Sequence, residues 1–131
     1  MLFRSDSDSD PTAFTNNDML TVKYSPAGGF QWSARYNAIA NNNDRSLGLT
    51  LDNSGNVYIA GRTFNGNNDN FILIKYNATG VQQWVRTFDN GGTDRAVGVV
   101  TDNNGLIYVA GRSDNGIDDD YRVIQIGRAH V

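Results

Sequence analysis

Short runs in which apolar and polar residues alternate occur along most of the chain. Between Ser46 and Leu51 three leucines alternate with Ser, Gly and Thr, which is the two-residue period of a strand. Other runs, such as VYIAG from Val57 and FILIKY from Phe71, are rich in the β-branched and aromatic residues that favour strands. The pattern predicts about ten strands and no helix, with strands near 19–24, 30–36, 46–51, 57–61, 71–76, 81–88, 96–101, 106–110 and 121–125.

The predicted strands belong to an internal repeat. The sequence DNSGNVYIAGR, which begins at Asp52, returns as DNNGLIYVAGR from Asp102. The segment 18–32 likewise matches 70–84, and 44–52 matches 94–102. Four short antiparallel strands about every 50 residues, with no helix between them, are typical of a β-propeller blade.

We therefore expect an all-β fold that is a fragment of a β-propeller with roughly two and a half four-stranded blades, because a closed propeller has about four to eight. Residues 1–17 would be the remnant of a preceding strand and a disordered loop. A half blade is expected at 18–37, a complete blade at 44–89 and an incomplete blade at 94–125. Residues 126–131 would form a tail outside the repeat.

Composition and charge exclude several classes of function. All fourteen acidic residues are Asp, and the formal net charge is −3 with no basic cluster. A nucleic-acid partner is therefore not expected, because binding would need a positive surface. The chain has no Cys, and no apolar run approaches the length of a membrane span. Zinc sites and nucleophile–histidine pairs have no residues to form them, so we expect no metal and no cofactor.

The tail departs from the repeat. After Ile124 the repeat predicts Lys-Tyr-Asn, as at positions 75–77, but the chain reads QIGRAHV. Residues 126–131 resemble the translation of a common sequencing-library adapter. We expect this segment to be foreign to the natural protein and the sequence to be a conceptual translation of a metagenomic read. His130 is the only histidine and lies in this segment, which argues against a catalytic or metal-binding role for it.

The motif D-x-x-G-N-V-Y-x-x-G, followed by I-K-Y-N-x-x-G-x-x-x-W, resembles the bacterial seven-bladed β-propeller repeats known as SBBP repeats. The resemblance covers about residues 18–124. It implies a secreted or cell-envelope protein in which the repeats form a scaffold. The family has no defined catalytic motif, so the resemblance implies no catalytic residue.

The candidate site follows from the direction of the strands. In an up-and-down blade, the tight glycine turns at 52–56, 77–80 and 102–105 lie at one end, and the Asn/Asp-rich loops lie at the other. Polar loops on a rigid scaffold are a common place for binding. The candidate binding residues in these loops are Asn42, Asp44, Asn67, Asp69, Asp94, Asp118 and Asp119.

The repeated polar and aromatic residues also have structural interpretations. Asp44 and Asp94 recur in each repeat, which favours caps that accept backbone N–H bonds over a catalytic carboxylate pair. The turns at Asp52 and Asp102 lack the alternating acidic ligands of a calcium loop. Trp32 and Trp84 are expected to pack between blades rather than to bind a ligand.

The expected function is a non-catalytic extracellular scaffold or recognition module that binds a polysaccharide or a protein. The alternative is a fragment of a propeller enzyme, a glycan hydrolase or lyase, whose active site lies outside this chain. A structural surface-layer role is a third possibility. The chain expressed alone is expected to self-associate, because a ring that cannot close exposes apolar blade faces.

Overall fold

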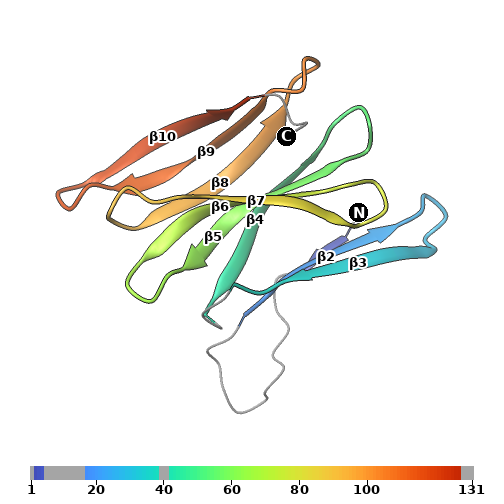
Figure 1. Ribbon diagram of the computed structural model, residues 1–131, viewed down its shortest axis with the longest axis horizontal. Coiled ribbons are helices and arrows are strands. Elements are labelled where there is room, and N and C mark those ends of the chain that lie inside the picture. The colour runs from blue at the N-terminus through green and yellow to red at the C-terminus, as the bar shows by residue number, and fades with distance from the viewer. Residues whose placement is uncertain (1, 5–16, 39–41, 128–131) are drawn as a thin grey trace, which may run out of the picture.

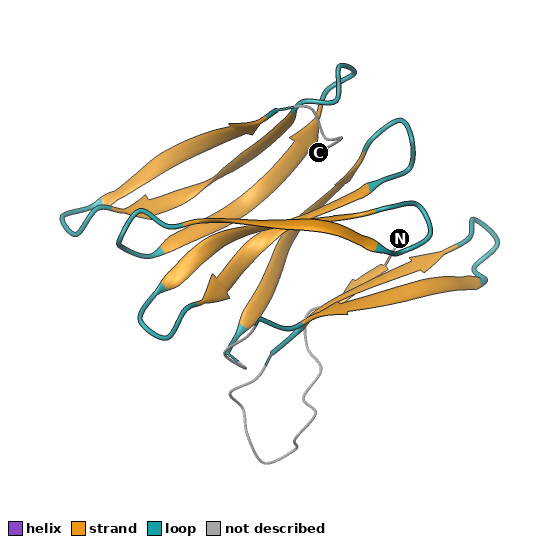
Figure 2. Cartoon of the chain, in the orientation of Figure 1, coloured by secondary structure: helices purple, strands orange, loops and turns teal. Residues whose placement is uncertain are grey.

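The computed structural model describes residues 2–4, 17–38 and 42–127. In these residues the chain forms ten strands and no helix, which confirms the predicted all-β class (Figure 2). The strands are β1 (Leu2–Arg4), β2 (Met19–Tyr24), β3 (Phe30–Tyr36), β4 (Asp44–Leu51), β5 (Val57–Phe64), β6 (Asp69–Tyr76), β7 (Gln82–Phe88), β8 (Asp94–Thr101), β9 (Ile107–Asp114) and β10 (Asp119–Ile126).

The strands form three antiparallel sheets. Their orders are β1-β2-β3, β4-β5-β6-β7 and β10-β9-β8, and we call them the first, middle and third sheets. Strand β1 pairs with β2, whereas residues 5–16 of the expected N-terminal loop lie outside the described part. At the other end, Ile126 was assigned to the tail but closes β10 opposite Ile107. Residues 128–131 lie outside the described part as well.

The strands next to the polar loops are longer than predicted. Strands β5 and β6 continue their ladder to the pair Phe64–Asp69, and β9 and β10 continue to Asp114–Asp119. The loops between them are therefore 65–68 and 115–118, which are shorter than the expected 63–69 and 113–119. The predicted strands end too early because the polar residues beyond them still form backbone hydrogen bonds with the neighbouring strand. These bonds need no apolar side chain.

The middle sheet lies between the other two sheets (Figure 1). Every residue of β6 is buried, because successive side chains point to opposite faces and both faces are covered. Toward the first sheet it presents Val57, Ile59, Ile72, Ile74 and Tyr76. Toward the third sheet it presents Tyr58, Ala60, Phe71 and Leu73. The even and odd positions of the same strands thus form two separate apolar cores.

The strand pattern predicts eleven buried apolar positions: Leu47, Leu49, Leu51, Val57, Ile59, Ile72, Ile74, Trp84, Val97, Val99 and Ile107. The prediction is wrong for Leu47, Leu51 and Val97, since all three are exposed. Leu47 lies in a β-bulge, because Ser46 pairs with Gly61 and the next pair is already Gly48 with Ala60. Val97 occupies the same position in the second bulge. The extra residue of a bulge breaks the two-residue alternation. Leu51 lies at the end of β4, and the other eight positions predicted to be buried are at least half-buried.

The bulges coincide with the closest approach of two sheets. A Cβ on Gly48 would lie 3.3 Å from the Cα of Gly98, so the backbones of β4 and β8 nearly touch there. The mid-strand Gly48 and Gly98 therefore mark a close approach of the first strands of successive repeats.

Gly61 and Gly111 test the tightness of the bulges. A Cβ at Gly61 would clash with the backbone carbonyl of Arg45, and a Cβ at Gly111 with that of Arg95. Backbone atoms cannot move aside, so we expect Gly61→Ala to lower the free energy of unfolding by about 3 kcal/mol or more. Gly98→Ala is the matched control, because its Cβ meets nothing within 4 Å. Equal losses for both variants in urea unfolding would contradict this packing.

The repeated Asp of the tight turns organises each turn. The Oδ1 of Asp52 accepts the backbone N–H groups of Ser54 and Asn56, and its Oδ2 accepts the Asn56 amide and the Tyr58 hydroxyl. Asp102 repeats these backbone contacts with residues 104 and 106. Burial alone would raise the pKa of Asp52, but the hydrogen bonds together lower it below its usual value of 3.8.

We expect Asp52→Ala to lower the free energy of unfolding by about 1–3 kcal/mol, because the turn donors lose their acceptor. The folded-state pKa is depressed, so the carboxylate's contribution is present above the usual value and disappears as the pH falls through the folded-state value. Asp52→Asn keeps an acceptor oxygen without the titration. Between about pH 5 and about pH 2 it should lose less stability than the wild type in urea titrations. Equal acid sensitivity would rule out this role.

Candidate functional site

The two ends of the sheets differ in their connections (Figure 1). The tight turns after β2, β4, β6 and β8 lie on the right and at the top of the view, and the loops 65–68, 89–93 and 115–118 lie on the left. We call these three loops, with residues 42–43, the loop end. Neighbouring loops are joined, because the side-chain amide of Asn68 donates to the carbonyl of Gly91 at 3.2 Å.

Asp44 and Asp94 are fully buried and cap the segments that precede them. Asp44 Oδ2 accepts the backbone N–H of Ala38 at 2.8 Å, and Asp94 Oδ2 accepts that of Asn90 at 2.7 Å. The hydroxyl of Ser113 also donates to Asp94 Oδ1 at 2.5 Å. The capping interpretation is confirmed, and no dissolved ligand can reach these carboxylates while the chain is folded.

The surroundings of Asp44 are apolar enough to shift titrations. Burial raises the pKa of Asp44, while hydrogen bonds from the Thr63 hydroxyl and the Ala38 amide oppose the shift. Burial, and then the nearby Asp44 carboxylate, raises the pKa of Tyr36. Burial next to Tyr36 raises the pKa of Tyr76 to about 12. Both tyrosines therefore keep their protons at neutral pH, and with Asp44 they form a structural cluster.

Asp69 lies where the middle and third sheets meet and binds two arginines. Its Oδ2 pairs with Arg62 on the neighbouring strand β5 and with Arg95 Nε on β8 at 2.9 Å. Asp119 repeats only the first of these pairs, with Arg112. Because Arg62 and Arg112 recur after the second strand of each repeat, the sequence predicts that each pairs with a loop Asp, and both pairs form. The contact with Arg95 was not predicted. The repeated Asp-Arg dipeptides at 44–45 and 94–95 were the available signal.

The remaining candidate residues are open to solvent to different degrees. Asn67 and Asp118 are exposed at the tips of their loops, and Asn42 is half-buried. The loops are fixed from inside: the Oδ1 of Asn65 accepts the backbone N–H groups of residues 67 and 68, and Asn115 does the same for 117 and 118. Two loops of equal geometry therefore present different tips to solvent, with Ile117 91% exposed where the other loop has Asn67.

The acidic run 118–120 does not form a metal site. The side-chain amide of Asn115 donates to Asp118 at 3.0 Å and to Asp120 at 3.1 Å, and Asp119 binds Arg112. Within the described residues no group of three or more His, Cys, Asp or Glu side chains could hold a metal ion. Asp118 and Asp120 thus share the Asn115 amide, and Asp119 is neutralised by Arg112.

The two tryptophans contact neighbouring sheets, as predicted. The indole Nε1 of Trp32 donates to the carbonyl of Ala78 at 3.0 Å, and the ring lies against Gly80, so the first sheet is fastened to a turn of the middle sheet. Trp84 packs against the core shared with the third sheet, with Arg86 over its ring. Neither indole is arranged as an open platform for a ligand.

A cavity of about 200 Å³ lies between the middle and third sheets. Its lining is almost wholly apolar and includes Phe71, Phe88, Ile124 and Ile126. Ile126 corresponds to Tyr76, whose larger ring packs beside Trp32 at the other sheet interface. Ile126 is thus the smaller side chain at the equivalent position. The cavity lining offers too few polar groups to orient a substrate.

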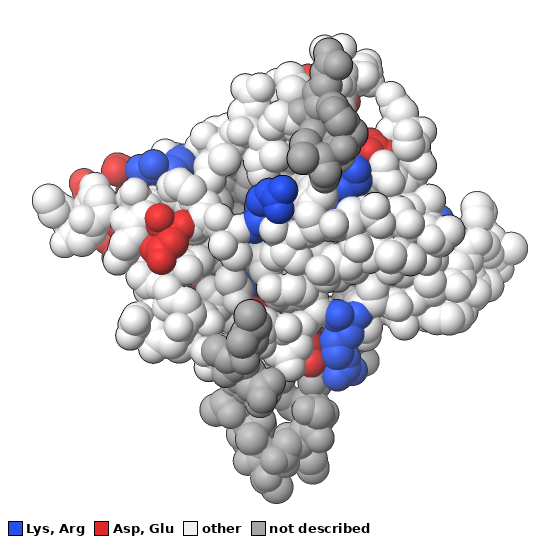
Figure 3. Space-filling view, viewed as in Figure 1, with Lys and Arg blue, Asp and Glu red and all other residues white. Residues whose placement is uncertain are grey.

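Charged side chains form small separate groups on the face seen in Figure 3, without a continuous basic surface. The part of the chain that the structure describes has no helix with the length and apolar character needed to cross a membrane. A comparison of the sequence with models of known protein families finds no match, and no curated protein matches it either.

The bridge at Asp69 gives a matched pair of variants. Asp69→Asn removes the partner of two arginines, and the Asp69 side chain is only 11% exposed. We expect a loss of about 1–3 kcal/mol of unfolding free energy, because a mostly buried charge network is disrupted. Asp119→Asn breaks a single pair that is about half exposed, and it should cost no more than about 1 kcal/mol. Urea unfolding measures both, and a larger loss at Asp119 would contradict the bridge.

Proposed function

We propose that the chain is a non-catalytic recognition module made of β-propeller repeats, and that it binds a polar polymer through the loop end. A secreted or cell-envelope polysaccharide is the ligand class that fits best. The observation that carries the proposal is the contrast between the framework of each loop and its tip. The same Asn and Gly hold loops 65–68 and 115–118, while the tips expose Asn67 in one and Ile117 with Asp118 in the other.

The chemistry of the tips suits a sugar. An amide can donate a hydrogen bond to one sugar hydroxyl and accept one from another, and a carboxylate can accept hydrogen bonds from two hydroxyls. An exposed apolar side chain can cover the apolar face of a sugar ring. Preorganised loops also lose little conformational entropy when they bind. The propeller arrangement is supported by three consecutive antiparallel sheets stacked face to face, with β4 and β8 in closest approach.

The alternative is a piece of a propeller enzyme. The recurring carboxylates argue against it within the described residues, because Asp44, Asp69 and Asp94 are already engaged by backbone donors or arginines. A glycosidase pair would need two carboxyl groups facing a common cleft. The pocket lined by Arg112, Asp119, Asp120 and Tyr121 does bring two carboxylates together, but Arg112 binds Asp119 and the Asn115 side chain donates to Asp120.

A glycan array with affinity electrophoresis in soluble polysaccharides tests the proposal. For a polysaccharide that the wild type binds, Asn67→Ala combined with Asp118→Ala should weaken binding about tenfold or more, which corresponds to about 1.4 kcal/mol. The matched control is Asn53→Ala combined with Asn104→Ala, which removes two exposed side chains from the turns at the opposite end. Absence of binding to every glycan, or equal losses in both variants, would overturn the proposal.

A further inference from the structure

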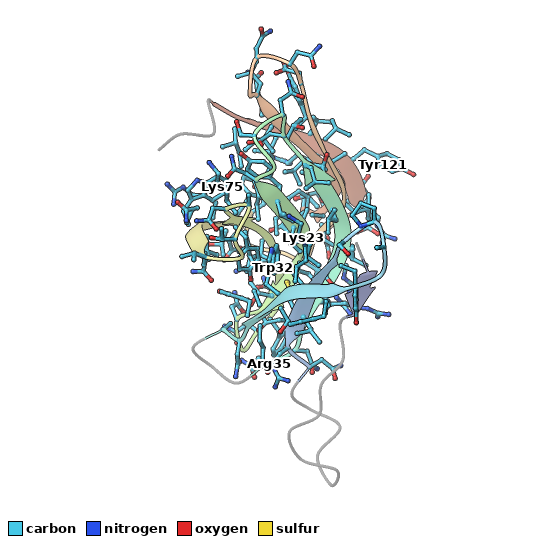
Figure 4. The ribbon with its side chains drawn as sticks, turned by 90° about the vertical axis from the view of Figure 1, so that its right-hand side faces the viewer. Lys23, Trp32, Arg35, Lys75 and Tyr121 are labelled. Carbon is cyan, nitrogen blue, oxygen red and sulfur yellow. The ribbon has the colours of Figure 1, made fainter. Side chains whose placement is uncertain are left out.

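The outer face of the third sheet exposes side chains whose counterparts in the middle sheet are buried. Tyr121 and Val123 are 94% and 68% exposed, whereas Phe71 and Leu73, which precede them by 50 positions, are each 3% exposed. Figure 4 shows Tyr121 projecting away from the body of the molecule. A surface with the same sequence pattern is therefore core in one repeat and open to water in the next.

Strand β9 repeats this contrast. Ala110 is exposed and Tyr108 half-buried, whereas Ala60 and Tyr58 at the same positions of β5 are fully buried. We call Tyr108, Ala110, Tyr121 and Val123 the outer face of the third sheet. Contiguous exposed apolar side chains of this kind mark an interaction surface.

The chain itself shows what covers such a face. On the middle sheet the corresponding residues pack against the opposite face of the next sheet, and that covering face consists of Ala96, Val99, Ile107, Val109, Ile124 and Ile126. The first sheet covers the middle sheet in the same order, because its residue Met19, the counterpart of Phe71, packs on Ile72 and Ile74. In both interfaces, the face that carries Phe71 or its counterpart packs on the face of the next sheet that carries Ile74 and Tyr76 or their counterparts.

The first sheet carries a face of the kind that could cover the outer face of the third sheet. Leu20, Val22 and Tyr24 correspond to Ile72, Ile74 and Tyr76, which form the covered face of the middle sheet. In the first sheet this face is not covered to the same degree: Tyr24 is exposed, stacks edge-on with the exposed Phe30, and continues into half-buried Leu20 and Val22. We call these four side chains the outer face of the first sheet.

We propose that the outer face of the third sheet binds the outer face of the first sheet of a second copy, head to tail. The contact would repeat the packing already present twice within the chain, and it does not depend on the proposed ligand of the loop end. A head-to-tail interface joins two different surfaces, so it produces a ring if the rotation closes and a filament if it does not.

Two variants and their mixture test this arrangement. Tyr121→Asp with Val123→Asp blocks the outer face of the third sheet, and Tyr24→Asp with Phe30→Asp blocks that of the first. All four side chains are exposed, so the fold should survive. The matched control, Val81→Asp with Asn53→Asp, adds the same charge at exposed positions in the tight turns of the middle sheet.

Sedimentation velocity over a range of concentrations gives the readout. We expect the wild type and the control to form oligomers larger than dimers, and each blocked variant to be monomeric because its dissociation constant rises at least about tenfold. The mixture of the two blocked variants should form a one-to-one dimer. A monomeric wild type would overturn the proposal. So would a first-sheet variant that still forms dimers alone, since this would mean a symmetric contact between two third sheets, and so would a mixture that stays monomeric.

Discussion

Burial of the middle sheet on both faces is the constraint on which the rest of the structure depends. An antiparallel sheet with one solvent-exposed face needs only one neighbouring sheet to cover its apolar face. Strand β6 instead has apolar side chains on both sides, so it has no polar face to expose to solvent. The middle sheet is therefore stable only between two others. The repeat supplies them, because each copy of the sequence carries both kinds of apolar face, and stacking buries a continuous core that no single copy could form.

The abundant Asp residues serve this stacking. Asp52 and Asp102 close turns, Asp44 and Asp94 fix the connections between sheets, and Asp69 binds an arginine from the next repeat. A short carboxylate is suited to these roles because it accepts several N–H bonds close to its own backbone. The chain has fourteen Asp and no Glu, and most of the described carboxylates hold turns, connections and strand ends in place. Acidic composition alone therefore says little about ligands.

Much of the fold could be predicted from the sequence, because the two-residue period and the 50-residue repeat are properties of the chain itself. The first two long strands, 19–24 and 30–36, were predicted to the residue. The bulge at Leu47 could not be, since it depends on how closely β4 approaches β8. The bridge from Asp69 to Arg95 joins two repeats, and the pattern within one repeat does not indicate the twist that brings them together. For the candidate site, the loops lie at the predicted end but are shorter than predicted, so Asp44, Asp69, Asp94 and Asp119 belong to strands. Asp44 and Asp94 are buried parts of the framework, whereas Asn67 and Asp118 are at the surface.

Differences between the repeats are therefore more informative about function than the residues they share. Asn65 and Asn115, with the glycine that follows each, hold loops of the same shape, so the backbone at the tips is the same. What changes is the side chain carried there, an amide in one loop and an isoleucine with a carboxylate in the other. A single exposed isoleucine is common on protein surfaces, so the 91% exposed Ile117 is informative only through its contrast with Asn67 on a loop of the same shape. The proposal of polysaccharide binding rests on this difference, because the two tips together offer an amide, a carboxylate and an apolar side chain on frames of the same shape.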